Sequence, residues 1–149
     1  MTDKRVCIRH ARLDDWEPLT KLIAKMVVDH SKFDPMTNTT VVGEGILHGI
    51  RSNEAVFVAE HEEELRGYVA WVHLPLSPAG LVSGLGTYVE PEYRKVGVSK
   101  LLRDAATDFC KRKGYCVVQG VAHIDNEAGL QSSLANGFSI TGHLVSKNL

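Results

Sequence analysis

The clearest periodicity in the sequence lies between residues 98 and 109, where apolar side chains recur at helical spacing. They are Val98, Leu101, Leu102, Ala105, Ala106 and Phe109, at i, i+3, i+4, i+7, i+8 and i+11. Side chains at this spacing fall on one face of a helix. The pattern therefore predicts an amphipathic helix with this face in the core, and Lys113-Gly114 marks its expected end.

Three other segments have weaker helical patterns. An apolar stripe after Asp14 predicts a first helix, with Leu19, Leu22, Ile23, Met26 and Val27 on its buried face. Residues 41–51 predict a second helix that Gly43, Gly45 and Gly49 weaken. A short helix is expected between Asp125 and Gly137. These helices alternate with stretches of a different pattern.

Stretches rich in β-branched and aromatic residues predict strands. They span residues 6–9, 55–60, 65–73, 81–89, 115–121 and 138–145. The second and third flank a polar turn and predict an antiparallel hairpin. Gly84 and Gly86 interrupt the 81–89 stretch, and a glycine inside a strand often marks a bulge or a close backbone approach. Together the elements indicate a mixed α/β fold of the α+β kind.

Length and charge restrict the class of protein. The 149 residues suffice for one domain with a sizeable core, so we expect residues 1–149 to form a single domain. Hydrophobic residues make up 44% and charged residues 23%, as in a globular chain. The net charge of −1 gives no global attraction to nucleic acid or to an anionic membrane, so neither is an expected partner.

The cysteines and histidines argue against a metal centre. The three cysteines follow no C-x-x-C spacing, and the seven histidines are scattered without an H-E-x-x-H motif. An odd number of cysteines also argues against a disulfide framework, so a reducing, cytoplasmic location is expected. We therefore predict no metal site.

The loop between the 81–89 strand and the 98–109 helix is the strongest candidate site. Pro91 turns the chain out of the strand, and Gly97 lies where the loop becomes the helix. The N–H groups at a helix start are unpaired, and the macrodipole adds partial positive charge. Arg94, Lys95 and Lys100 add full charges. This pattern predicts a cradle for a phosphate or pyrophosphate, and the alternative is an ordinary helix start with a solvated basic turn.

From Tyr88 the chain reads Tyr-Val-x-Pro-x-Tyr-Arg-x-x-Gly-x-Ser, and an amphipathic helix follows. This stretch resembles the acetyl-coenzyme A loop of the GNAT acyltransferase family, whose pattern is Arg or Gln, two residues, Gly, one residue, then Gly or Ala. Ser99 replaces the last small residue. Asn126 followed by Gly137-Phe138 is similar to the family's closing Asn…Gly-Phe element. The resemblance extends from about Val6 to the end of the chain.

The resemblance implies a central mixed, mostly antiparallel sheet flanked by helices, with a strand–loop–helix pyrophosphate site. It also implies acetyl-coenzyme A as co-substrate. The residues expected to bind it are Thr87, Tyr88, Val89, Arg94, Lys95, Val96, Gly97, Val98, Ser99, Lys100 and Asn126. Backbone N–H groups near Thr87 to Val89 would polarise the thioester carbonyl. Phe33, Met36 and Trp71 are the candidates for contact with the acceptor.

The implied activity is transfer of an acetyl group to a primary amine, which attacks the thioester directly while the protein positions both substrates. The acceptor could be a small molecule or a protein amine. The alternative is a module of the same fold that binds coenzyme A without transfer. Whether the chain forms a homodimer stays open.

The acid–base groups are the least defined part of the site. Many family members have a tyrosine acid seven residues after the asparagine, and this position is Ser133 here. Many also have a carboxylate on one of the two central strands, but residues 81–89 and 115–121 contain none. His73, His123 and Asp125 lie near strand ends that could face the cleft. The candidates for proton transfer are therefore Ser133, His123 and His73.

Overall fold

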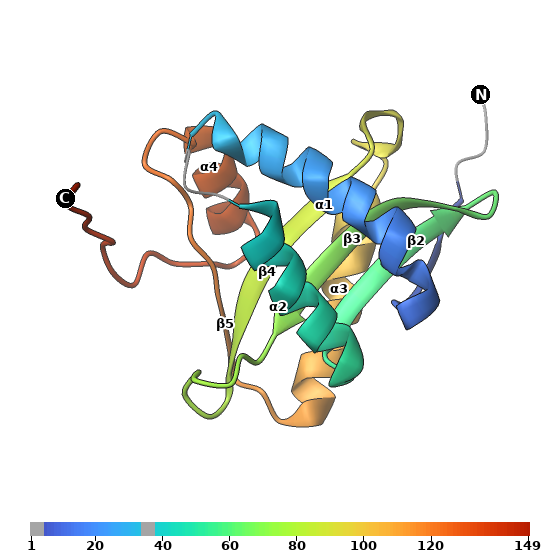
Figure 1. Ribbon diagram of the computed structural model, residues 1–149, viewed down its shortest axis with the longest axis horizontal. Coiled ribbons are helices and arrows are strands. Elements are labelled where there is room, and N and C mark those ends of the chain that lie inside the picture. The colour runs from blue at the N-terminus through green and yellow to red at the C-terminus, as the bar shows by residue number, and fades with distance from the viewer. Residues whose placement is uncertain (1–4, 34–37) are drawn as a thin grey trace.

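The computed structural model describes residues 5–33 and 38–149. Its centre is a five-stranded sheet (Figure 1) in the order β1 (Cys7–His10), β2 (Ala55–His61), β3 (Glu64–Val72), β4 (Leu81–Val89) and β5 (Val117–Gln119). The first four strands pair antiparallel with their neighbours, and β5 runs parallel to β4. The expected mixed, mostly antiparallel sheet and the 55–73 hairpin are confirmed.

Helices cover both faces of the sheet. α1 (Trp16–Ser31) and α2 (Thr39–Arg51) lie in front of it in Figure 1, and α3 (Val98–Lys113) lies behind it. α4 (Glu127–Ala135) lies apart from these layers, beside the C-terminal end of α1. Short 3₁₀ turns, Leu13–Asp15 and Pro91–Tyr93, precede α1 and the loop before α3. No described helix is long and apolar enough to cross a membrane.

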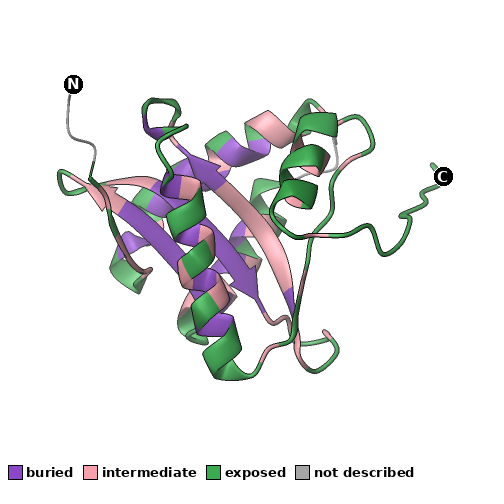
Figure 2. Ribbon diagram, turned by 180° about the vertical axis from the view of Figure 1, so that it is seen from behind, coloured by how far each residue is buried: buried purple, intermediate pink, exposed green. Residues whose placement is uncertain are grey.

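The sheet separates two cores because successive side chains of a strand point to opposite faces. On β3, Tyr68 and Ala70 pack in the core under α1 and α2, whereas Val69 and Trp71 pack in the core under α3. Figure 2 shows how fully the middle strands are buried. This double coverage explains why residues 55–59 read as an unbroken apolar run.

The glycines of α2 let this helix lie close to the sheet. A Cβ at Gly49 would be 2.6 Å from Cγ2 of Val72. A Cβ at Gly45 would be 2.8 Å from Cδ1 of Leu85. Two of the three glycines that weaken the helical pattern in the sequence, Gly45 and Gly49, are therefore required by its packing, whereas a Cβ at Gly43 would be in ordinary contact with Trp16 at 3.8 Å.

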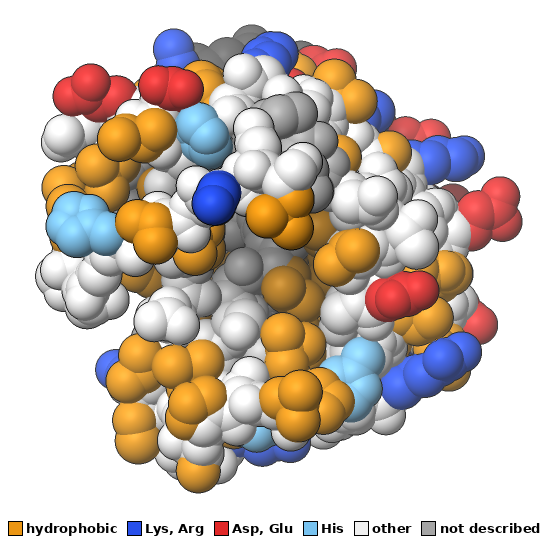
Figure 3. Space-filling view, turned by 60° about the vertical axis from the view of Figure 1, so that its left-hand side comes forward, with side chains coloured by type: hydrophobic (Ala, Val, Ile, Leu, Met, Phe, Trp, Pro, Cys, Tyr) orange, Lys and Arg blue, Asp and Glu red, His pale blue; other side chains and the backbone are white. Residues whose placement is uncertain are grey.

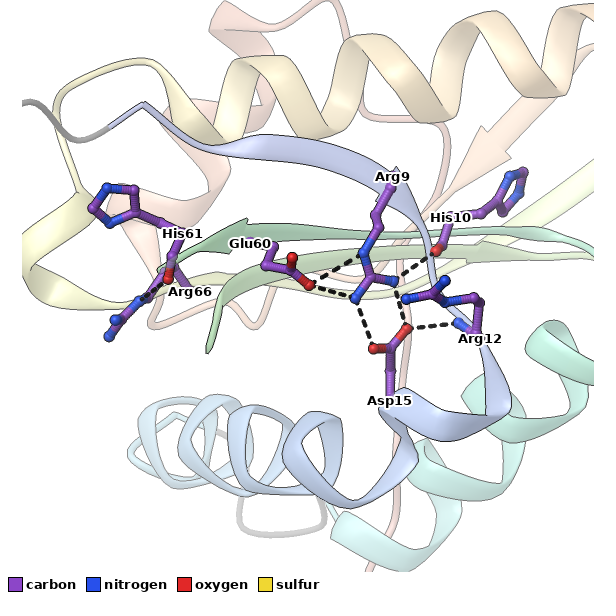
Figure 4. A network of polar contacts seen from close by, with 7 residues as sticks. All are labelled: Arg9, His10, Arg12, Asp15, Glu60, His61 and Arg66. Carbon is purple, nitrogen blue, oxygen red and sulfur yellow. Dashed lines mark hydrogen bonds and ion pairs between the residues drawn. The ribbon is translucent and has the colours of Figure 1, made fainter. Parts of the chain in front are cut away.

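The guanidinium of Arg9, on β1, links the start of α1 to β2 (Figure 4). Its Nη1 and Nη2 donate to the two carboxylate oxygens of Asp15 at 2.7 and 2.8 Å, and Nη2 also donates to Glu60 at 2.7 Å. Asp15 in turn accepts the backbone N–H of Arg12 at 2.7 Å. The hydrogen bonds from Arg9, opposed by burial, lower the pKa of the Asp15 carboxyl.

Two expectations about the C-terminal half are wrong. Residues 138–145 form no strand, and β5 has three residues rather than the seven expected from 115–121. A strand gains its stability from a partner, and the short β5 offers a new strand little edge to pair with. The apolar side chains of this segment stay largely exposed, with Ile140 at 62%, Leu144 at 80% and Val145 at 88%.

The buried face of α3 is also narrower than its apolar pattern. Leu101 is 49% exposed, whereas Val98, Leu102, Ala106 and Phe109 are buried with Cys110. The buried positions follow one ridge of the helix, and Leu101 lies to one side of it. Gly114 ends the helix in a left-handed conformation with φ of +85°, as Lys113-Gly114 predicted.

Candidate active site

β4 bulges in its middle. Trp71 pairs with Gly84 and Val69 pairs with Thr87, so Leu85 and Gly86 together lie opposite Ala70 alone. Gly86 has φ of +112°, a backbone conformation that other residues rarely adopt. The bulge expected from the two glycines of this strand is confirmed.

β4 and β5 diverge immediately beside this bulge. They pair only between Leu81–Ser83 and Val117–Gln119, and no described strand pairs with this side of β4 beyond Ser83. The backbone groups on this side of residues 84–89 are therefore available to a ligand. Gly84, which packs near Trp71, marks where the two strands separate.

A cavity of about 460 Å³ opens at this divergence. Figure 3 shows this side of the molecule, which is hollowed at its centre. Its walls come from α1, β4, the loop after it, α3, α4 and the segments next to α4. The lining residues include Met26, Asp29, His30, Trp71, Thr87, Tyr88, Val89, Arg94, Ser99, Arg103, Asn126, Ser132, Ser133, Asn136 and Phe138.

The start of α3 has the geometry of an anion cradle. Lys95 and Gly97 both have positive φ, at +64° and +88°. The first helical hydrogen bond runs from the Leu101 N–H to the Gly97 carbonyl at 3.0 Å, so the N–H groups of residues 98–100 have no helical partner. Apart from Gly97 and its two neighbours in the chain, no described atom lies within 4 Å of the place that a Gly97 Cβ would occupy. This open space and these donors fit a pyrophosphate.

Two of the three expected cations are engaged elsewhere. Nε of Arg94 donates to the carbonyl of Val89 at 2.7 Å, and its guanidinium lies over the Tyr88 ring at 5.3 Å from the centroid. Nζ of Lys100 pairs with Asp104 at 2.7 Å, one turn along α3. Arg94 still lines the cavity, but its main contacts hold the loop against the end of β4.

Arg103 is a cavity cation that the sequence analysis missed. It lies one turn after Ser99 on α3, and its Nη1 donates to the Ser99 hydroxyl. Its Nη2 donates to Oδ1 of Asn136 at 3.1 Å and so connects α3 to the end of α4. The i, i+4 spacing of Ser99 and Arg103 was the signal that could have identified it.

α4 brings its own polar residues to the cavity. The side-chain oxygen of Asn126 caps this helix by accepting the Gly129 N–H at 3.0 Å. Ser132 and Ser133 follow on the same helix and line the cavity together with Asn126. The structure thus brings Ser133 into the same cavity as Thr87, and its catalytic role stays a prediction.

The two histidines proposed from the sequence lie outside this lining. The Nδ1 atom of His73 is 2.7 Å from the carbonyl of Leu81, at the end of β4 remote from the loop. Nδ1 of His123 is 3.1 Å from the backbone nitrogen of Asp125. His30, in the last turn of α1, lines the cavity instead. In the sequence, His30 is a polar residue that follows the apolar stripe of the first helix. Nothing in that pattern marked it as a site residue.

Of the three residues predicted to contact the acceptor, one is found in the cavity lining. Trp71 is buried and lines the cavity. Phe33 is half-buried just after α1 and is not among the lining residues. Met36 lies outside the described residues.

The electrostatic character of the cavity favours an anion. In the described part of the chain, its charged lining residues are Arg94, Arg103 and Asp29. Burial, and then the charge of Glu90, raises the pKa of the Tyr88 hydroxyl, which therefore stays protonated near neutral pH. Among the described residues, no three His, Cys, Asp or Glu side chains form a group that could hold a metal ion.

Comparison with known proteins identifies the family. The sequence pattern of the Acetyltransferase (GNAT) family matches residues 16–130. The chain therefore belongs to the GNAT acetyltransferase family, which confirms the family resemblance. No curated protein sequence matches the chain.

Solved structures share the fold at low sequence identity. The PaiA N-acetyltransferase of Thermoplasma acidophilum in complex with coenzyme A is 19% identical, with a TM-score of 0.73 over 92% of this chain and 91% of that chain. AAC(6')-Iy with the bisubstrate analogue CoA-S-monomethyl-acetylneamine is 19% identical, with a TM-score of 0.70 over 98% and 99%. A ribosomal-protein-alanine N-acetyltransferase of Brucella melitensis is 20% identical, with a TM-score of 0.71 over 91% and 86%.

Proposed function

We propose that the protein transfers the acetyl group of acetyl-coenzyme A to a primary amine by direct attack of the amine on the thioester. One observation carries this proposal: a single cavity is lined both by Ser99, in the first turn of α3 beside the cradle, and by Thr87 to Val89 on the unpaired edge of β4. A long ligand with an anionic end and an amide-containing arm matches these two features. The coenzyme A named in the structures of PaiA and AAC(6')-Iy has this form.

The cradle would bind the pyrophosphate. Unpaired N–H groups of residues 98–100 would supply donors, and Arg103, which contacts Ser99, would supply positive charge near them. The arm of the ligand would lie along β4, where residues 84–89 offer backbone groups on the side facing the gap. Asn126 borders the opposite wall of the same cavity.

The chemistry requires mainly positioning. The amine lone pair forms a bond to the carbonyl carbon, the carbon–sulfur bond breaks, and its electron pair leaves on sulfur. Negative charge develops on the carbonyl oxygen, and N–H groups near Thr87 to Val89 would stabilise it. The bulge at Gly86 changes the direction of the β4 backbone next to these groups.

We favour catalysis over a module that only binds coenzyme A. The cavity is not limited to the cradle and the strand edge, because it also borders His30 on α1 and Trp71 on β3. This additional space is what an acceptor would need, and simple coenzyme A binding gives no reason for it.

The test is release of free thiol from acetyl-coenzyme A with a panel of amines. The panel contains an aminoglycoside, a peptide with an N-terminal alanine and a simple diamine, since the first two acceptor types appear in the names of similar proteins. Amine-dependent thiol release and an acetylated product are expected. If the protein binds coenzyme A tightly but no amine accelerates thiol release, the result would support the binding module instead.

A further inference from the structure

The cavity contains few groups that could remove a proton from the acceptor. An amine arrives mostly as an ammonium, because an alkylamine has a pKa of about 10.4, and only the neutral form attacks a carbonyl. Among the residues that the structure describes, the titratable side chains that line the cavity are Asp29, His30, Tyr88, Arg94 and Arg103. The question, which depends on the proposed function, is which of them accepts this proton.

Four of the five groups are poorly suited. An arginine stays protonated, so Arg94 and Arg103 accept no proton. The raised pKa of Tyr88 keeps its phenol protonated. Asp29 faces two cations, with Nη2 of Arg94 at 3.7 Å and Nζ of Lys32 at 3.9 Å from its carboxylate oxygens. Both cations compete with a substrate ammonium for this carboxylate.

His30 is placed next to the reacting part of β4. Met26, one turn earlier on the same face of α1, also lines the cavity, and its Cε lies 3.0 Å from the position of a Cβ at Gly86. Side chains four residues apart on a helix are neighbours, separated by about one 5.4 Å turn. His30 is therefore one turn beyond the bulge, on the face of α1 that borders the cavity.

The position of α1 over β4 is fixed by a charged contact. Nζ of Lys25 donates to Glu90, immediately after β4, at 2.6 Å. Lys25 precedes Met26 in the chain, so this contact and the Met26–Gly86 packing hold the same turn of the helix. His30 follows in the next turn and lines the same cavity as Thr87 and Tyr88.

We propose that His30 is the general base of the acetyl transfer. A ring nitrogen of the neutral imidazole accepts one proton from the substrate ammonium and becomes imidazolium. The freed amine forms the bond to carbon, the thiolate leaves with the carbon–sulfur electron pair, and the nitrogen's second proton passes to the thiolate, directly or through water. The imidazolium returns its proton to solvent, so the products are amide, thiol and one proton.

The test compares His30→Gln with the wild type across pH. The variant should lose about 10²–10⁴-fold in kcat/KM at neutral pH, the range typical of a general base. In the wild type, kcat/KM should fall toward acid pH, because a general base must be unprotonated to accept a proton. In the variant, kcat/KM should instead rise with the hydroxide concentration. Added imidazole should restore part of its activity.

Two controls separate catalysis from folding and binding. His48→Gln, on α2 and outside the cavity lining, should keep the wild-type profile. The thermal stabilisation by coenzyme A should be equal in the wild type and in His30→Gln. A His30→Gln variant with unchanged activity, or with lower activity but the wild-type pH profile and no rescue by imidazole, overturns the proposal. A wild type inactive with every amine would instead overturn the proposed function itself.

Discussion

The hydroxyl of Tyr68 lies directly beneath Gly86, so close that a Cβ at position 86 would be 2.7 Å from the hydroxyl oxygen. Tyr68 is fully buried, and its hydroxyl has no hydrogen-bond partner in the described part of the chain. Burial also raises the pKa of this phenol, so it stays neutral. A buried hydroxyl without a described hydrogen-bond partner thus lies against the bulge that shapes the candidate active site.

Tyr68→Phe should leave the free energy of unfolding unchanged or raise it, because an unsatisfied buried polar group costs about 1–3 kcal/mol. Urea unfolding measures this. A loss of more than about 1 kcal/mol would mean that the hydroxyl makes a favourable hydrogen bond after all.

Gly86→Ala should destabilise the fold, both by the clash with Tyr68 and by its φ of +112°. Overpacking of this kind costs about 1–3 kcal/mol. In the Tyr68→Phe background the cost should be smaller by about 0.5 kcal/mol or more, the coupling expected of residues in contact. Equal costs in both backgrounds would show that the backbone conformation alone requires this glycine.

Gly97→Glu should abolish the thermal stabilisation by acetyl-coenzyme A, because bulk and negative charge both enter the cradle. For the wild type this stabilisation is about 2.7 kcal/mol at 100 times the dissociation constant. Gly114→Glu is the matched control, since Gly114 ends the same helix with φ of +85° and also has open space around it. Both variants should lose about 1–2 kcal/mol of stability from the left-handed backbone.

Only Gly97→Glu should lose the thermal stabilisation by acetyl-coenzyme A. If Gly114→Glu lost it equally, the effect would come from damage to α3 and not from the cradle. An unchanged response in Gly97→Glu would place coenzyme A elsewhere.

Ser133→Ala should lower kcat less than tenfold, well below the ~10²–10⁴-fold of a positioned general acid. A thiol leaves easily, with a pKa near the ~8.5 of cysteine, and a serine hydroxyl is a poor acid. Ser132→Ala serves as comparison, because both serines line the cavity. A hundredfold loss of kcat in Ser133→Ala alone, with intact coenzyme A affinity, would make Ser133 catalytic.

Asp15→Asn should lower the free energy of unfolding at pH 7 by about 1.5–3 kcal/mol, the value of a hydrogen bond to a charged group. Arg9 lowers the pKa of Asp15 in the folded protein. The ionised carboxylate therefore stabilises the fold above its ordinary pKa of about 3.9, and this contribution is lost as pH falls below that value.

The difference between the wild type and Asp15→Asn should therefore shrink in acid unfolding experiments below about pH 4. Asp14→Asn, at the exposed neighbouring residue, is the matched control and should change stability little. If the difference in the free energy of unfolding between the wild type and Asp15→Asn stayed constant down to acid pH, the ion pair could not be its cause.

The sequence alone determined the elements whose signals are local. The 3.6-residue pattern located α3, the apolar runs located β2 and β3, and Gly84 and Gly86 indicated the bulge of β4. The loop at Arg94 and Gly97, together with the element from Asn126 to Phe138, indicated the family in the sequence, because each is made by residues close together in the chain.

Tertiary structure decided everything that depends on residues distant in the chain. Arg94 turns toward Val89 rather than toward the cradle, and His30 rather than His73 borders the cavity. Residues 138–145 have a strand pattern but form no strand. Local sequence sets backbone preferences over a few residues, whereas the direction of a side chain and the pairing of a strand depend on which surfaces meet after the chain has packed.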